Sequence, residues 1–61
     1  MSKYLVYVWG GPYLSSVVST EDPALIELLK QVLPKNGYRV LVRRAMDGGY
    51  RDVEDVRPKK K

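Results

Sequence analysis

The sequence predicts one small α+β domain, an antiparallel sheet of three or four strands with one helix packed on one face. Three observations support this prediction. Two segments rich in aromatic and β-branched residues flank a Gly-Gly-Pro turn, a capped apolar segment has helical character, and Asp-Gly-Gly marks a second hairpin near the C-terminus. The predicted order is therefore strand, strand, helix, strand, strand.

The first hairpin is predicted from residues 4–9 and 13–18. Residues 4–9 (YLVYVW) contain the side chains that strands favour. They lead into Gly10-Gly11-Pro12, where glycine tolerates a positive φ and proline lacks the N–H that a central strand needs. We therefore expect the second segment to lie toward an edge of the sheet.

The helix is predicted to run from Pro23 to Leu33. The preceding segment, residues 19–22, is a cluster of capping residues, and proline suits the first helical position. The helix should end at Leu33 because Pro34 disfavours helical geometry in the residue before it, and Asn36-Gly37 is typical of a turn.

The apolar side of this helix is wider than one sheet face requires. At about 100° per residue it covers an arc of roughly 200°, and it consists of Ala24, Leu25, Ile26, Leu28, Leu29, Val32 and Leu33. Only Glu27, Lys30 and Gln31 lie on the polar side. The excess predicts a second packing surface, such as a symmetry-related copy of the chain.

The second hairpin is predicted from residues 38–45 and 50–56, joined at Asp47-Gly48-Gly49. With Asp47 and Gly48 as a two-residue turn, Arg43 lies opposite Asp52 and Val42 lies opposite Val53. This gives an ion pair on one face and an apolar pair on the other. Residues 50–56 also have apolar side chains at a helical interval, so a short helix remains the alternative there.

The length and composition favour self-association over covalent reinforcement. A chain of 61 residues buries a small core and is marginally stable alone. With 0 Cys and 0 His it has neither disulfides nor a Cys/His zinc site, so a homodimer is expected. No apolar run is long enough to cross a bilayer and the N-terminus does not resemble a signal peptide, so we expect a cytoplasmic protein with no membrane partner.

The net charge of +4 is concentrated at the C-terminus. Residues 1–56 contain seven cations and seven anions, so the excess comes from Arg57, Lys59, Lys60 and Lys61. We therefore predict a single domain without net charge over residues 1–56 and a disordered basic tail over residues 57–61.

The catalytic options are few. Without His or Cys, the usual general base and thiol nucleophile are missing, and the remaining side chains form no recognisable catalytic set. The acidic run Asp47, Asp52, Glu54 and Asp55 could in principle hold a hard cation, but nearby arginines favour ion pairing instead. We expect no enzyme, no cofactor and no metal site.

The sheet face opposite the helix is the candidate binding surface. If Tyr4, Val6, Val8 and Val17 face the helix, alternation places the following residues together on the other side: Leu5, Tyr7, Trp9, Arg39, Leu41 and Arg43. Aromatic rings beside arginines suit stacked, unpaired bases. The same residues also suit a protein interface, in which Trp, Tyr and Arg are enriched.

Two functions follow from this surface. The leading hypothesis is a small binding module that contacts nucleic acid through Tyr7, Trp9, Arg39, Arg43 and Arg44, with Lys59, Lys60 and Lys61 as an electrostatic arm. The alternative is a regulator or inhibitor that docks its apolar sheet face or an edge strand on a larger protein. The neutral body favours the alternative, whereas the tail and the arginine-rich strand favour nucleic acid.

Overall fold

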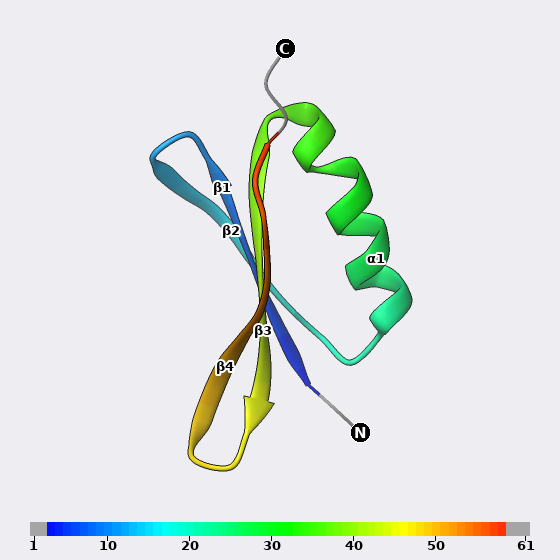
Figure 1. The fold of residues 1–61 in the computed structure, drawn as a ribbon, viewed down its shortest axis with the longest axis vertical. Coiled ribbons are helices and arrows are strands. Elements are labelled where there is room, and N and C mark those ends of the chain that lie inside the picture. Colours follow the sequence, from blue (N-terminus) through cyan, green and yellow to red (C-terminus); the bar gives the residue numbers. More distant parts are fainter. Residues whose placement is uncertain (1–2, 59–61) are drawn as a thin grey trace.

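The computed structural model describes residues 3–58 and shows a small four-stranded antiparallel sheet with one helix (Figure 1). The elements in chain order are β1 (Tyr4–Gly10), β2 (Tyr13–Thr20), α1 (Pro23–Val32), a 3₁₀ turn (Pro34–Asn36), β3 (Tyr38–Met46) and β4 (Gly49–Val56). The ambiguous segment at the C-terminal side is thus a strand and not a helix. No helix among the described residues is long and apolar enough to span a membrane.

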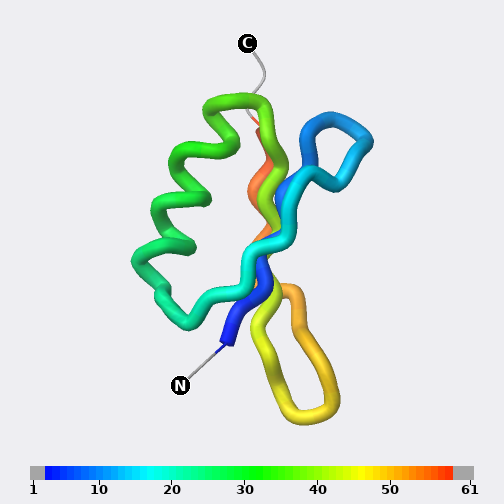
Figure 2. The backbone as a smooth tube through the Cα atoms, turned by 180° about the vertical axis from the view of Figure 1, so that it is seen from behind, coloured from blue at the N-terminus to red at the C-terminus, as the bar shows by residue number. Residues whose placement is uncertain are grey.

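The strands lie in the order β2-β1-β3-β4, so β1 and β3 are central and β2 and β4 are the edges. All three neighbouring pairs are antiparallel. Helix α1 connects the edge strand β2 to the central strand β3 and covers one face of the sheet, while the β1–β2 turn bends away from it (Figures 1 and 2). The other face, which we call the open face, has no layer over it among the described residues.

The core lies between the two central strands and the helix. Val6 is paired with Val42, and Val8 with Val40, and all four side chains pack with Ile26 of α1. Val6 and Val40 are completely buried, at 0% exposure. Alternate residues of β1 and β3 therefore point to opposite faces, as strand geometry requires.

The helix begins and ends close to its predicted limits. The side chain of Asp22 accepts a hydrogen bond from the backbone N–H of Ala24 at 2.9 Å, and Pro23 is the first helical residue. Leu33 caps the other end and donates its N–H to the carbonyl of Leu29 at 3.0 Å. Gly37 follows the 3₁₀ turn with φ of 88°, a conformation that glycine adopts without steric cost.

The apolar arc of the helix is only partly covered. Ile26 is buried, whereas Leu28 and Val32 are 54% and 44% exposed. The structure therefore leaves one apolar flank of α1 without a partner among the described residues.

Val17 does not face the helix, contrary to the prediction. A two-residue turn pairs Gly10 with Tyr13, and unbroken pairing from there would place Val17 opposite Val6. A β-bulge leaves Ser15 without a partner and shifts the register by one residue, so Val18 lies opposite Val6. Val17 lies opposite Tyr7 instead, on the open face.

The register of the second hairpin also differs from the prediction. The turn at Asp47 and Gly48 and the pairing of Arg43 with Asp52 are confirmed. Beyond that pair the register shifts, so Val42 lies opposite Glu54 and the predicted pair of Val42 with Val53 is wrong. A bulge again moves every later residue of the strand to the other face.

Candidate interface on the open sheet face

The open face brings together four of the residues singled out in the sequence. Tyr7 and Trp9 on β1 lie opposite Leu41 and Arg39 of β3, and Arg43 lies opposite Leu5. On the edges, β2 contributes Leu14 and Val17, and β4 contributes Asp52 and Asp55. The surface thus changes across the sheet, from apolar at β2, through aromatic and basic in the centre, to acidic at β4.

Tyr7 and Trp9 form a stacked pair. Their ring centroids are 5.8 Å apart and their planes are inclined by 18°. Residues two apart on a strand share a face, and this spacing lets the two rings lie one against the other. The pair presents a large apolar surface that is already ordered.

Each of the two aromatic rings also has an arginine over it. The guanidinium carbon of Arg39 lies 5.0 Å from the centroid of Trp9, and that of Arg43 lies 5.0 Å from the centroid of Tyr7. Both distances are typical of cation–π contacts. The arginines therefore lie along the sheet surface against the rings, with their charged groups directed toward β4.

Both arginines are paired with carboxylates of β4. Arg39 donates two hydrogen bonds to Asp55, from Nε at 2.9 Å and from a terminal nitrogen at 2.6 Å. Arg43 donates one bond from Nε to Asp52 at 2.8 Å. The hydrogen bonds from Arg39 lower the pKa of Asp55, and the same pairing raises the pKa of Arg39.

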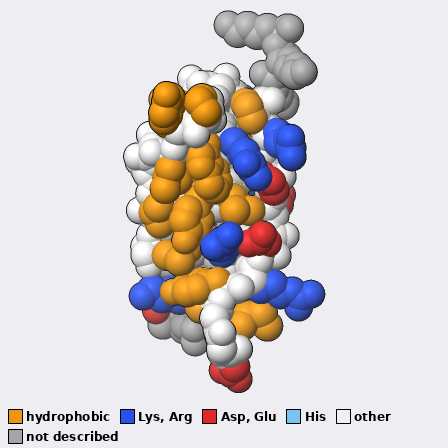
Figure 3. Space-filling model, turned by 90° about the vertical axis from the view of Figure 1, so that its left-hand side faces the viewer, with side chains coloured by type: hydrophobic (Ala, Val, Ile, Leu, Met, Phe, Trp, Pro, Cys, Tyr) orange, Lys and Arg blue, Asp and Glu red, His pale blue; other side chains and the backbone are white. Residues whose placement is uncertain are grey.

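The open face is consequently apolar and electrically balanced. Figure 3 shows a broad hydrophobic patch bordered on one side by adjacent basic and acidic side chains. Leu41, although on this face, is only 8% exposed because neighbouring side chains cover it. Leu14 and Val17 are 50% and 48% exposed, so the patch is most accessible toward β2.

Arg44 does not join this face. It lies opposite Tyr4 of β1 and Arg51 of β4, on the helix side of the sheet. The predicted contribution of Lys59, Lys60 and Lys61 lies outside the described residues.

The acidic run is divided between the two faces. Asp52 and Asp55 bind arginines on the open face, whereas Glu54 accepts a hydrogen bond from Lys30 at 2.6 Å on the helix side. Lys30 also donates to Glu27 at 2.7 Å, and these two bonds raise its pKa. Within residues 3–58, no cluster of three or more Asp, Glu, His or Cys side chains is arranged to hold a metal ion.

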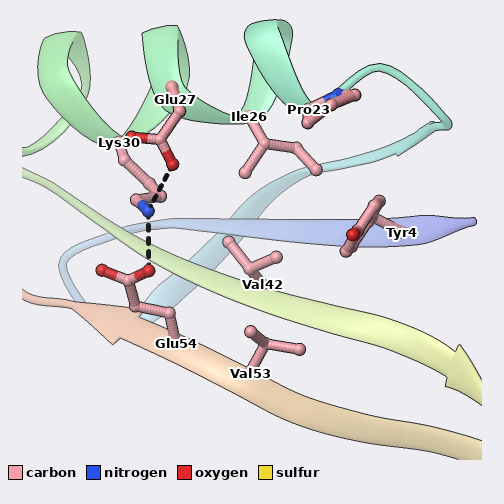
Figure 4. Close-up of a pocket in the computed structure, with 8 residues that line it drawn as sticks. All are labelled: Tyr4, Pro23, Ile26, Glu27, Lys30, Val42, Val53 and Glu54. Atoms are coloured by element: carbon pink, nitrogen blue, oxygen red, sulfur yellow. Dashed lines mark hydrogen bonds and ion pairs between the residues drawn. The ribbon is translucent and has the colours of Figure 1, made fainter. Parts of the chain in front are cut away.

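Lys30 and its two carboxylates border a shallow pocket between α1 and the β3–β4 hairpin (Figure 4). The other lining residues are Tyr4, Pro23, Ile26, Val42 and Val53. The charged groups of the pocket bind one another, so its ion pairs join the helix to the sheet. We assign it a structural role.

Sequence reasoning missed Asp55 as the partner of Arg39 and missed Leu14 and Val17 as members of the patch. Val17 and Asp55 are placed by the two bulges, since each bulge reverses the faces of the residues beyond it, whereas Leu14 lies between the turn and the first bulge, opposite Trp9. An ion pair at Arg43 and Asp52 leaves Asp55 on the open face only if one intervening residue of β4 is unpaired.

Comparison with models of protein families, with curated proteins and with solved structures finds no match for this chain.

Proposed function

We propose that this chain is a non-enzymatic protein-binding module that docks its open face on a larger protein, as a regulator or inhibitor would. The observation that supports this proposal is the pairing of both open-face arginines with carboxylates, Arg39 with Asp55 and Arg43 with Asp52. Because these charges are paired, the open face presents an apolar and aromatic surface, and the charged groups at its rim already have hydrogen-bond partners.

Such a surface has the composition of an interface centre. Trp and Tyr supply much of the binding energy of protein interfaces, and they do so where a rim of neighbouring groups excludes water. Here Trp9 and Tyr7 are held by each other and by the arginines, so little side-chain freedom is lost on binding. The exposed Leu14 and Val17 extend the apolar area toward β2.

The same pairing weakens the case for nucleic acid on this face. Phosphate binding requires cations that are free to replace condensed counterions. Arg39 and Arg43 would have to leave their carboxylates, and Asp52 and Asp55 would then repel the phosphates. Binding to a neutral protein surface requires no such rearrangement.

One observation favours nucleic acid as the second candidate, at a different place. Arg44 and Arg51 lie directly opposite each other, an arrangement that like charges disfavour, and neither forms an ion pair within residues 3–58. If this pair binds phosphates, substitution of both residues by Ala should abolish salt-sensitive oligonucleotide binding, and Trp9→Ala should leave it unchanged.

A photo-cross-linking amino acid placed at Leu14 tests the proposed function. Leu14 is on the open face and half exposed, and Lys35, in the exposed 3₁₀ turn, is the matched control position. Irradiation in the host cells should give a discrete adduct with another protein from position 14, which Trp9→Ala abolishes. Adducts with nucleic acid, or the same protein adduct from position 35, would contradict the proposal.

A further inference from the structure

The two edges of the sheet differ sharply in charge. The edge strand β4 carries Arg51, Asp52, Glu54 and Asp55, together with a bulge opposite β3. The edge strand β2, Tyr13–Thr20, contains no charged residue at all. Charged side chains and bulges are the usual devices that keep sheet edges from pairing with other chains. By this measure β4 is protected along most of its length and β2 is not.

The unprotected part of β2 is its second half. The bulge at Ser15 disturbs the strand near the β1–β2 turn, and from Ser16 to Thr20 the pairing with β1 is regular. On the outer side of this segment the backbone N–H and C=O groups meet no other strand of the described residues, because β2 ends the sheet. The segment thus offers a regular, uncharged edge of the kind to which another strand adds.

The exposed apolar flank of α1 lies opposite the ion-paired side of the helix. Lys30 reaches Glu54 of β4, so the side of the helix that carries Lys30 and Glu27 faces the β4 edge. Leu28 and Val32 each stand two residues from Lys30, about 200° around the helix, so they project from the opposite side of α1, and they are half exposed.

We propose that a second copy of this chain binds at the β2 edge, with the two β2 strands paired antiparallel along Ser16–Thr20. Two such edges are self-complementary, because neither carries a charge and the antiparallel arrangement is compatible with a two-fold axis. The occupant is a second copy because an uncharged strand has no charge pattern to select a foreign partner, whereas it matches itself. A chain of 61 residues also gains the buried area that its own core lacks.

The direction of the two-fold axis determines which elements lie on each side of the dimer. When it passes through a residue pair and stands perpendicular to the sheet, directly opposed residues share a face. The two four-stranded sheets then form one continuous sheet, with both helices on one side. Both open faces lie on the other side, and Val17 of each copy lies near the middle of the joined surface. This goes beyond the proposed function, because the dimer would carry two copies of the open face on the same side.

The solution mass of the full chain tests this proposal, with Val17→Lys and Val53→Lys as a matched pair. Both valines lie on edge strands and are about equally exposed, at 48% and 54%. The wild type and Val53→Lys should have about twice the chain mass of 7.0 kDa. Val17→Lys places like charges close together across the axis, so its dimer should dissociate at least about tenfold more readily.

Two further measurements keep the test decisive if Val17→Lys does not fold. Those amides of Ser16–Thr20 that point away from β1 should be protected from hydrogen exchange in the wild type, and their protection should rise with protein concentration. Trp9→Ala should remain dimeric. A monomeric wild type, exchange that is independent of concentration, or dissociation caused by Trp9→Ala would overturn the proposal, the last because it would indicate pairing of open faces instead of edges.

Discussion

Arg39 lies between Asp55 and Trp9, donating two hydrogen bonds to the carboxylate while its guanidinium carbon lies 5.0 Å from the centre of the indole. One side chain thus connects β4 to the aromatic pair of β1 through β3. The consequence is twofold. The charge of Arg39 is satisfied within the chain, and Trp9 is held in an orientation suited to contact with another surface.

The Arg39–Asp55 pair should make stability depend on acidic pH. The pKa of Asp55 is lowered from its ordinary value of 3.8 by the hydrogen bonds from Arg39, so the unfolded chain binds this proton more readily than the folded one. The stabilisation is therefore present above pH 3.8 and is lost as the pH falls through the lower, folded pKa. Thermal unfolding of the wild type and Asp55→Asn should differ at neutral pH and converge in strong acid. A constant difference at all pH values would contradict the assignment.

Lys30 should stabilise the contact between α1 and β4, with the opposite dependence on pH. Its pKa is raised above 10.5 by hydrogen bonds from its ammonium group to Glu27 and Glu54, so its stabilisation is complete below pH 10.5 and is lost as the pH rises through the folded pKa. Lys30→Met should reduce the free energy of unfolding by about 0.5–1 kcal/mol at neutral pH. Chemical denaturation measures this, and Lys35→Met is the control because Lys35 is exposed in the 3₁₀ turn. Equal effects of the two variants would show that the ion pairs contribute nothing specific.

The valine pairs between β1 and β3 should dominate the stability of the fold. Val6→Ala removes two buried methyl groups at a site with 0% exposure, and we expect a loss of about 2 kcal/mol in the free energy of unfolding. Val53→Ala, at 54% exposure, should change it by less than about 0.5 kcal/mol. Urea denaturation followed by circular dichroism provides both values. Similar losses at the two positions would mean that the core is elsewhere.

The N-terminal cap of α1 should contribute measurably to the free energy of unfolding. Asp22 accepts the N–H of Ala24 at 2.9 Å, and Asp22→Ala leaves this donor without its partner. The expected loss is about 1 kcal/mol. Glu21→Ala removes the same charge one residue earlier, where the residue precedes the cap, and should cost much less. If the two variants unfold at the same denaturant concentration, the effect is one of charge and not of the cap.

Much of the fold follows from local sequence signals. The helix limits follow from Asp22, Pro23 and Pro34, and the second hairpin follows from Asp47 and Gly48, because each of these residues restricts the backbone where it stands. The alternation of residues 4–9 correctly separates the core valines from the aromatic pair. Each of these features depends on residues that are close together in the chain, so it can be recognised in the sequence.

The arrangement of the edge strands could not be read in the same way. The bulge at Ser15 moved Val17 to the open face, and the shift after Arg43 moved Asp55 beside Arg39. A bulge leaves one residue unpaired and reverses the faces of all residues beyond it, so strict alternation along the strand does not give their positions. The centre of the open face and the pair of Arg43 with Asp52 were therefore predictable, whereas the pair of Arg39 with Asp55 was not.

The most direct test of the account is to remove the carboxylates that pair with the open-face arginines. We predict that wild-type protein shows no salt-sensitive quenching of Trp9 fluorescence by mixed oligonucleotides at low salt. The double variant Asp52→Asn/Asp55→Asn should acquire it, because Arg39 and Arg43 become free to bind phosphates beside the rings. The control Glu21→Gln/Glu27→Gln changes the charge equally but away from this face. Strong, salt-sensitive quenching of the wild type would contradict the account and identify the open face as a nucleic-acid surface.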